Sequence, residues 1–381
     1  MTEFWLISAP AEKTCQETWE RLQAATLPSN LSSNVKFNIP QLKVGILDVL
    51  VELSDDLKVL DEFVAKLHTN IATYVSSLLL GDVRDKIGEI LLAKENDIIT
   101  YITNFQWDLA KFPITESMRV LYEMIKKEVH QIDNDFNSRT ATYEKLKENV
   151  NTMEKKQEGG FLTKSLAQIV KKEDFVLDSE YLVTILVVVS KANYEEWVKH
   201  YETLSDFVVP RSSRIISQDS DNYLCNVTLF KKVVNYFTTK AKERNFFVRE
   251  FSYDEERMKK ETEALSTAIF EKKKYFGPLF RWLQLNFSEA FISWIHVKAL
   301  RVYVESVLRY GLPVNFQAML LRPNEKNKKR LREVLNDLYR HLMGSSVALV
   351  ADTSSSSVSD YDMDKEDYYP YVYFKIDCTL S

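Results

Sequence analysis

Residues 113–160 read PITESMRVLYEMIKKEVHQIDNDFNSRTATYEKLKENVNTMEKKQEGG, and this stretch decides the fold. From Ile114 to Met153 an apolar residue recurs every three or four positions, with two interruptions. The spacing predicts one amphipathic helix that ends at Gly159-Gly160. At about 1.5 Å per residue it would be about 65 Å long, whereas a compact domain of ~150 residues is about 30–40 Å across. We therefore expect this helix to protrude from the domain in which it begins.

Further helices are predicted before this stretch. Residues 3–7 read as a short strand and residues 12–25 as a helix. A longer helix is expected to begin at Ser54, a favourable N-cap followed by two acidic residues, and to end at Gly81. Its single apolar stripe indicates a partner helix. Helical patterning then continues from residue 82 towards residue 112.

The pattern changes after residue 160. Residues 181–189 form a β-branched, nearly all-apolar run, which is typical of a strand buried on both faces. The elements that follow are a helix at 194–204, strands at 214–217 and 223–230, a helix at 231–244 and a strand at 246–251. This series predicts a small α/β domain. The sequence shows no evident internal repeat.

Helical patterning returns at Asp254. We expect this helix to run back beside the 113–157 helix, because both border the α/β segment. Gly277-Pro278 predicts a break in the chain. The helix that follows, at 279–308, is apolar nearly all round and must therefore lie in a core.

The C-terminal part mixes helix, loop and strand. Residues 322–341 predict a basic amphipathic helix. The serine-rich and then acidic stretch 344–367 reads as a mobile loop. Residues 368–376 return to strand character and could pair with the N-terminal strand, which would bring both termini into one domain.

These elements predict a mainly α fold with α/β parts, in an elongated molecule with two ends. A helical foot domain with strands from both termini would comprise residues 1–120 and 276–381. A long antiparallel helical neck would comprise residues 121–160 and 253–275. A small α/β head domain, residues 161–252, would be inserted between the two neck helices.

Composition excludes several classes of protein. With 45% hydrophobic and 28% charged residues, the chain has the profile of a folded, water-soluble protein rather than a disordered one. The net charge of -5 lacks the positive field that non-specific nucleic-acid binding requires. Three well-separated cysteines suggest free thiols in a reducing compartment. We expect neither a signal peptide nor a membrane span, and therefore a cytoplasmic protein without direct membrane insertion.

Signatures of catalysis are sparse. The eight glycines form neither GxGxxG nor a Walker A motif, and the five histidines show no paired metal-ligand spacing. His296 lies within the apolar helix, where a hydrogen-bonded core histidine is favoured over a ligand or a base. The acidic pairs Asp55-Asp56 and Asp133/Asp135 read as caps or solvated faces. We therefore predict no catalytic residue, metal or cofactor.

Basic clusters are the remaining candidate sites. A solvated helix face explains each of them, and docking to acidic partner helices is the sharper alternative. The candidate partner-binding residues are Lys231, Lys232, Lys240, Lys242 and Arg244 at one helix, and Lys328, Lys329, Arg330 and Arg332 at another.

The longest runs of the chain resemble one known family. Residues 287–321 read FSEAFISWIHVKALRVYVESVLRYGLPVNFQAMLL, and this run is similar to the C subunit of the V-type (vacuolar) proton ATPase. Shorter runs carry the same resemblance, namely TEFWLISAP at 2–10, QWDLAKFP at 106–113, LDSEYLV at 177–183 and VVPRSS at 208–213. The resemblance spans essentially the whole chain and is strongest to vertebrate members. It points to the less widespread isoform.

The resemblance implies a non-catalytic stator subunit. The head would bind a peripheral stalk made of subunits E and G, and the foot would meet another stalk and the cytosolic part of subunit a. The protein would support ATP-driven proton transport and organelle acidification, regulate reversible assembly, and associate peripherally with endomembranes or the plasma membrane through the complex. An actin-binding or coiled-coil adaptor and an enzyme housed in the α/β unit are the alternatives.

Overall fold

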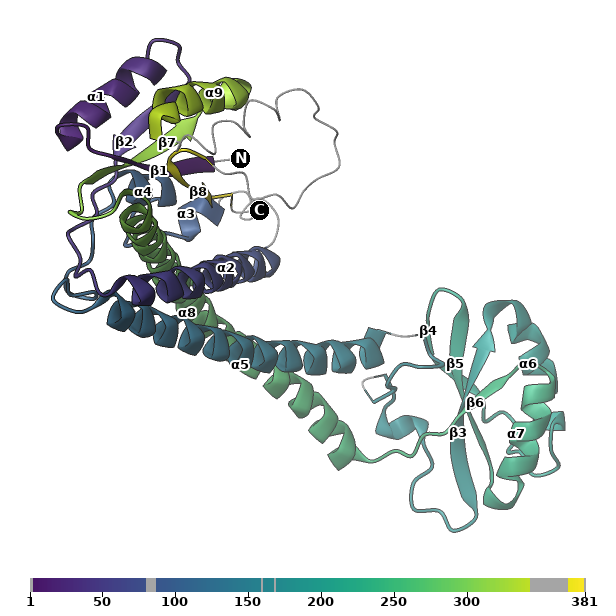
Figure 1. Cartoon of the computed structure of the whole chain (residues 1–381). Coiled ribbons are helices and arrows are strands. Elements are labelled where there is room, and N and C mark those ends of the chain that lie inside the picture. Colours follow the sequence, from purple (N-terminus) through teal and green to yellow (C-terminus); the bar gives the residue numbers. More distant parts are fainter. Residues whose placement is uncertain (1–2, 80–86, 159, 168, 343–368, 380–381) are drawn as a thin grey trace. The chain divides into compact units, whose positions relative to one another are not determined.

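The computed structural model describes residues 3–79, 87–158, 160–167, 169–342 and 369–379 (Figure 1). The chain divides into two compact units. Unit 1 comprises Met1–Arg139 and Leu279–Ser381, and unit 2 comprises Thr140–Pro278. Each unit has its own β-sheet and its own hydrophobic core.

The sheet of unit 1 is built from both ends of the chain. Its antiparallel strands lie in the order β2-β7-β1-β8. Their bounds are β1 Glu3–Pro10, β2 Ser32–Lys36, β7 Phe316–Pro323 and β8 Val372–Asp377. Strand β8 pairs with β1 in a register that places Asp377 opposite Glu3. The predicted pairing of the C-terminal and N-terminal strands is therefore confirmed, whereas β2 and β7 were not anticipated.

Helices cover both faces of this sheet. Helices α1 (Cys15–Thr26) and α9 (Lys328–Tyr339) pack on the face that carries Trp5 and Ile7. The opposite face meets the long helix α8 (Glu255–Tyr310), where the hydroxyl oxygens of Ser8 and Ser306 lie 2.7 Å apart. Alternate residues of β1 thus enter two apolar layers, and β1 is buried along most of its length.

The remaining helices of unit 1 pack around α8. Helices α2 (Leu47–Leu78) and α5 (Met118–Glu158) lie side by side, with ring contacts between Phe63 and His130 and between Tyr74 and Phe136. The short helices α3 (Ile87–Ile90) and α4 (Ile98–Thr103) follow α2. Every residue of α8 from 290 to 300 is buried, which confirms the predicted core position of this apolar segment.

The sheet of unit 2 has the strand order β4-β5-β3-β6 and is antiparallel throughout. The elements occur along the chain in the order β3 (Leu182–Ser190), α6 (Tyr194–His200), β4 (Arg214–Gln218), β5 (Asn222–Phe230), α7 (Val234–Glu243) and β6 (Phe247–Arg249). This order is a split β–α–β topology, in which each of the two helical connections crosses over one intervening strand, whereas β4 and β5 are adjacent and joined directly. The predicted small α/β domain is confirmed.

Both faces of this sheet are covered. Trp197 of α6 and Phe237 of α7 are fully buried on one face, next to Val187 and Val227. Leu186 and Leu224 point to the other face, where residues including Phe161 and Met258 cover them. The prediction of a β3 strand buried on both faces is therefore confirmed.

Unit 2 contains an internal structural repeat, and the expectation of no repeat was wrong. Strand β3, the 3₁₀ turn Lys191–Asn193 and helix α6 are matched forty residues later by β5, the 3₁₀ turn Lys231–Val233 and α7. The burial patterns of the two strands are identical. The repeat escaped detection because it conserves the order of elements and the burial of positions, but neither the residues nor their polarity: Leu186 and Val188 of β3 correspond to Asn226 and Thr228 of β5.

Helices α5 and α8 also meet within unit 2. Tyr143 of α5 lies 6.5 Å from Tyr275 and 6.0 Å from Phe276 of α8, measured between ring centroids. Val150 and Ala268 are buried nearby along the same two helices. The expected return of the second helix beside the first is confirmed here. The foot, neck and head boundaries stay a prediction.

Two predicted helix boundaries near the N-terminal half were wrong. Ser54 does not cap α2, because the apolar stripe extends back through Leu50 and Leu53, and the Ser54 hydroxyl donates instead to Glu305 of α8 at 2.7 Å. No continuous helix spans the described part of residues 82–112. The backbone of Lys94 and Glu95 has φ values of 50° and 66°, a left-handed conformation that ends any helix.

Two further predicted helix boundaries were wrong, and two predictions concern residues that the structure does not describe. Helix α5 begins at Met118 rather than at Pro113. The predicted basic helix at 322–341 is shortened to α9, because its first residues belong to β7. The predicted helix end at Gly81 and the loop at 344–367 lie outside the described residues.

Pro278 does not break the chain into two helices, as was predicted. Helix α8 runs through it without interruption. Proline cannot donate a hydrogen bond to the carbonyl of residue 274, which normally disfavours a helix interior by about 3 kcal/mol. Gly277 and Pro278 are both exposed, so water can reach that carbonyl. Packing of Phe276 on Tyr143 before the proline and of Trp282 under Arg139 after it holds the helix in place.

Candidate partner-binding surfaces

The five predicted cations of unit 2 lie on and around α7. Three of them have partners within the unit: Lys231 Nζ donates to the Ser179 carbonyl at 2.7 Å, Lys232 Nζ lies 3.4 Å from the ring centre of Phe207, and Lys240 Nζ pairs with Glu243 at 2.9 Å. Lys242 and Arg244 are exposed at the end of the helix. The five cations are therefore divided between the two ends of α7 and are held in different ways, and their role in partner binding stays a prediction.

The four predicted cations of unit 1 lie on α9. Lys328 Nζ pairs with Glu3 of β1 at 3.1 Å, which ties the start of the helix to the sheet. Lys329 and Arg330 are exposed. Arg332 is partly buried and points inward. The cluster therefore divides into two structural cations and two that face solvent.

The guanidinium of Arg332 lies within a cage of aromatic rings. Its central carbon is 4.3 Å from the ring centre of Trp5, 4.2 Å from that of Tyr369 and 4.3 Å from that of Tyr373. Burial acts to lower the pKa of Arg332, but the hydrogen bond to Tyr373 and the electrostatic attraction of Tyr373, Tyr371 and Tyr369 together outweigh it, and the pKa is raised. Arg332 therefore joins α9 to β1 and to the chain entering β8. This inward position favours a structural role for Arg332 over the predicted role in partner binding.

A buried charge cluster in unit 1 was missed by sequence reasoning. Asp61 of α2 is 3% exposed and accepts hydrogen bonds from Trp294 Nε1 at 2.7 Å, from Lys298 Nζ at 2.9 Å and from Arg301. Lys298 Nζ also donates to the Lys375 carbonyl of β8 at 3.0 Å. The available signal was the presence of Lys298 and Arg301 within an otherwise apolar helix, since buried cations require an anion.

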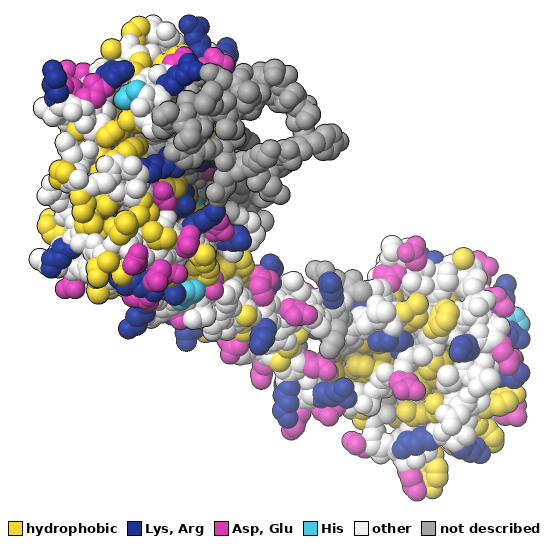
Figure 2. Space-filling view, in the orientation of Figure 1, with side chains coloured by type: hydrophobic (Ala, Val, Ile, Leu, Met, Phe, Trp, Pro, Cys, Tyr) yellow, Lys and Arg dark blue, Asp and Glu magenta, His cyan; other side chains and the backbone are white. Residues whose placement is uncertain are grey.

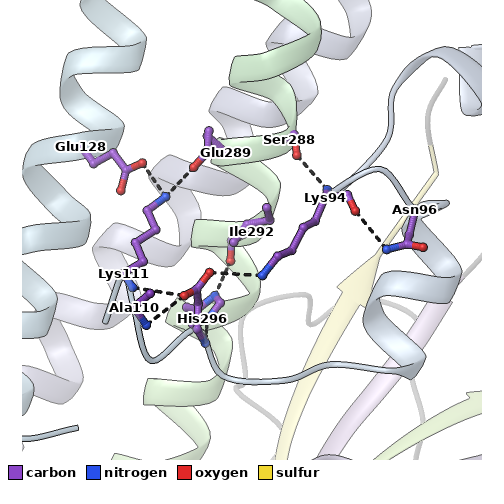
Figure 3. Close-up of polar contacts among 10 residues, drawn as sticks. Lys94, Asn96, Ala110, Lys111, Glu128, Ser288, Glu289, Ile292 and His296 are labelled. Carbon is purple, nitrogen blue, oxygen red and sulfur yellow. Dashed lines mark hydrogen bonds and ion pairs between the residues drawn. The ribbon is translucent and has the colours of Figure 1, made fainter. Parts of the chain in front are cut away.

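His296 is held in the core by hydrogen bonds at both ring nitrogens (Figure 3). Its Nδ1 donates to the Ile292 carbonyl at 2.8 Å, and its Nε2 accepts the backbone N–H of Asp108 at 3.1 Å. Burial lowers the pKa of His296 to about 4, so the ring is neutral and can accept at Nε2. The prediction of a hydrogen-bonded core histidine is confirmed.

The loop that contains Asp108 is anchored by further ion pairs (Figure 3). Lys111 Nζ lies 2.6 Å from Glu128 of α5 and 2.5 Å from Glu289 of α8. The Asp108 carboxylate accepts from the backbone N–H of Ala110 and of Lys111 and pairs with Lys94 at 3.4 Å. These groups bind one another, which makes the network a structural clamp between helices α5 and α8.

The acidic pairs occupy solvated helix faces, as predicted. Asp55 is exposed, and Asp56 pairs with Arg119 of α5 at the surface. The Asp133 carboxylate accepts from Asn137 Nδ2 at 3.2 Å on the same helix. Neither pair brings two carboxylates into a shared buried site.

A cleft in unit 2 bears on the enzyme alternative. It has a volume of about 610 Å³ and lies beside β6, α7 and the start of α8. Two of its charged groups are engaged within the protein: Arg249 donates to the carbonyls of Leu162 and Lys164, and Asp254 caps α8 by accepting from the N–H of Glu256 and Arg257. These contacts give Arg249 and Asp254 structural roles.

Exposed cations thus lie on both units, each of which has its own core. The sequence profile of the V-ATPase C subunit matches residues 4–372. The chain belongs to the V-ATPase C-subunit family, and the resemblance stated from the sequence is confirmed.

Full-length relatives agree with this assignment. The chain is 59% identical to the C 1 subunit of the V-type proton ATPase of Xenopus laevis, over 100% of the chain and 99% of the relative. It is 58% identical to the rat protein of the same name and 57% identical to the C 1-A subunit of the V-type proton ATPase of Danio rerio, with the same coverage. The chain therefore has the role of a V-ATPase subunit in proton transport. That it is the less widespread isoform stays a prediction.

A solved structure with limited likeness to this chain belongs to the same kind of complex. The cytoplasmic N-terminal domain of subunit I, a homologue of subunit a of the V-ATPase, aligns over 88% of this chain and 98% of that domain, at a TM-score of 0.31 and 13% identity. A likeness at that level carries no conclusion about fold or function. Within the residues that the structure describes, none of the helices has the length and apolar character needed to cross a membrane.

Proposed function

We propose that this chain is a non-catalytic stator subunit that links the peripheral stalks of the V-ATPase, made of subunits E and G, to subunit a of the membrane sector. One observation carries the proposal: the family match extends over nearly the whole chain, whose two units each have a core of their own and an exposed basic surface. Unit 1 would supply the foot, unit 2 the head, and the paired parts of α5 and α8 the neck.

Two contacts on one chain explain how such a link can be both firm and reversible. Once one unit is bound, the other is held near its own partner at a high effective concentration, so each contact can be weak by itself. Loss of either contact then lowers the overall affinity by a large factor. The protein could in this way regulate assembly of the two sectors and reside at membranes only through the complex.

Binding of the full-length chain to its two partners tests the proposal. The E–G heterodimer and the cytosolic part of subunit a would be immobilised separately, and the affinity of the purified chain for each would be measured. We expect saturable binding to both, and binding of both together to be tighter than to either. Absence of binding to E–G, together with cosedimentation with actin filaments, would instead favour the adaptor alternative.

A further inference from the structure

Buried polar atoms without a hydrogen-bond partner gather at one place in the structure. Among the residues that the structure describes, six side-chain atoms are of this kind, and two of them belong to Arg249 of β6 and Ser293 of α8. The other four lie on α9 and on the chain that enters β8, namely Arg332 Nη1, Asn336 Oδ1 and the hydroxyl oxygens of Tyr339 and Tyr371. Since nearly all buried polar groups in folded proteins have a partner, this concentration needs a physical explanation.

The four groups lie together between α9 and the start of β8. Arg332, Asn336 and Tyr339 follow one another at intervals of four and three residues, so they lie along one face of the helix. Tyr371 packs against that face, because its ring centre is 5.6 Å from that of Tyr339. Tyr339 is 4% exposed and Tyr371 is fully buried. We call these four residues the polar junction.

The polar junction is separated from the surface of unit 1. The visible surface over α1 and α9 carries charged side chains of both signs (Figure 2), whereas the four unpartnered atoms lie beneath it. Solvent at the surface therefore cannot supply the missing hydrogen bonds. Whatever satisfies these atoms has to lie inside the protein, between α9 and the chain entering β8.

Arg332 and Tyr371 face each other at this place. Burial raises the pKa of Tyr371, and the guanidinium of Arg332 acts in the opposite direction, which requires the two groups to be neighbours. The Tyr371 hydroxyl nevertheless has no polar atom at hydrogen-bond distance. Polar groups that face each other beyond hydrogen-bond distance are typically bridged by a water molecule.

The donors and acceptors of the polar junction match water and not an ion. Arg332 Nη1 can only donate a hydrogen bond and Asn336 Oδ1 can only accept one, whereas the two tyrosine hydroxyls can do either. Water both donates and accepts, so one molecule can connect Arg332 to Asn336. An anion would be repelled by the Asn336 oxygen, and a cation by the Arg332 guanidinium.

We propose that the polar junction binds ordered water, which connects Arg332 and Tyr371 to Asn336 and Tyr339. Buried waters make about three hydrogen bonds each to groups that otherwise lack partners, so about one or two molecules serve all four groups. The bound water joins α9 to the chain entering β8. It thereby helps to fix the helix that carries two of the exposed candidate cations.

Removal of a hydroxyl distinguishes a hydrated group from one without any partner. If water binds, Tyr371→Phe and Tyr339→Phe each remove a hydrogen bond to it, and we expect each variant to unfold about 1–3 °C below wild type. A hydroxyl without a partner gives the opposite sign, because phenylalanine removes an unsatisfied polar atom. Tyr303→Phe is the matched control: the Tyr303 hydroxyl donates directly to the Leu42 carbonyl at 2.9 Å, so its loss should also lower the midpoint. Thermal unfolding of the full-length chain, followed by circular dichroism, measures all three.

A crystal structure of the full-length wild-type chain tests the proposal directly. We expect density for a water molecule within about 2.7–3.2 Å of Arg332 Nη1 and of the Tyr371 hydroxyl. A direct hydrogen bond between these two groups with no such density, or a higher midpoint for both phenylalanine variants of the junction, would overturn the proposal. An anomalous signal at the same position in crystals grown with bromide would assign the junction to an anion instead.

Discussion

The cores of the two units differ in the polar groups that they bury. Unit 1 buries the ionisable side chains of Asp61, His68, His296 and Lys298. The buried polar side chains of unit 2, within the described residues, are Thr184, Ser205, Asn226 and Thr228, which do not titrate. Both cores are otherwise apolar. The comparison shows that unit 1, where distant segments converge on α8, pairs the charges that it buries, whereas the polar groups buried in the described core of unit 2 are neutral.

The largest expected difference between the units is their response to acid. Burial lowers the pKa of His68 and of His296 from 6.5 to about 4. Between pH 6.5 and 4 the unfolded chain therefore binds protons that the folded unit does not, and the stability of unit 1 falls as the pH falls through this window. Each histidine contributes about 3 kcal/mol that is present above pH 6.5 and lost by pH 4.

Hydrogen exchange followed by mass spectrometry at several pH values, corrected for intrinsic rates, would resolve the two units. We expect peptides of unit 1 to lose protection between pH 6.5 and 4.5 while peptides of β3 and β5 keep theirs. Facing His68 are Lys298 and Asp61, and facing His296 are Asp108, Lys111 and Lys94. His68→Phe, within a stack that includes Trp294, should reduce the loss. Equal losses in both units would contradict the comparison.

Removal of the buried anion should be the most damaging single substitution of the charge cluster. Asp61→Ala leaves Lys298 buried without its counter-ion, which should lower the free energy of unfolding by about 3–5 kcal/mol. Asp56→Ala on the same helix removes only the surface pair with Arg119 and should cost about 1 kcal/mol or less. Urea unfolding of both variants measures the difference, and similar midpoints would show that burial of Asp61 has no special effect.

The aromatic cage of Arg332 should contribute less than the Asp61 cluster. Arg332→Ala removes a cation that contacts three rings and should lower the free energy of unfolding by about 2 kcal/mol. Arg330→Ala, two residues earlier and exposed, should change it by about 0.5 kcal/mol or less. Thermal unfolding monitored by tryptophan fluorescence compares the two. A larger effect at Arg330 would mean that the inward cation is not the structural one.

The smallest expected effect is a gain in stability within α8. A Cβ added at Gly277 would meet no atom within 4 Å, so nothing in the packing requires glycine there. Gly277→Ala should therefore raise the stability of α8 by about 0.5–1 kcal/mol through helix propensity. Slower hydrogen exchange of α8 near residue 277 would show it. Faster exchange would mean that the glycine relieves strain caused by Pro278.

Prediction from the sequence succeeded where one element carries its own periodicity. The stripe from Met118 to Val150 and the apolar runs at β3 and along α8 were recognised because burial on one or all faces leaves a pattern in neighbouring residues. Prediction of helix boundaries failed at three positions. Ser54 contacts Glu305 instead of capping a helix, and the left-handed backbone at Lys94 ends a helix that the side-chain pattern would continue. At Pro278, packing outweighs the local preference of proline for a helix break.

The candidate sites follow the same rule. The basic character of α7 and α9 was readable from composition, but the division into structural and available cations was not. Lys328 and Lys232 have similar sequence surroundings, yet one pairs with Glu3 of β1 and the other lies over Phe207. The tyrosines at 369, 371 and 373 alternate as in a strand, which could have suggested one shared face, although not a cage around Arg332.

By itself, the sequence determined the helical character of the long segments, the two-sided burial of β3 and the family to which the chain belongs. These properties depend on the order of polar and apolar residues along the chain or on the identity of long runs. Only the tertiary structure decided that Asp61 meets Lys298, that Arg332 turns inward and that two unlike segments form a repeat. Such facts depend on which side chains become neighbours in space, and contacts across more than 200 residues leave no local pattern to read.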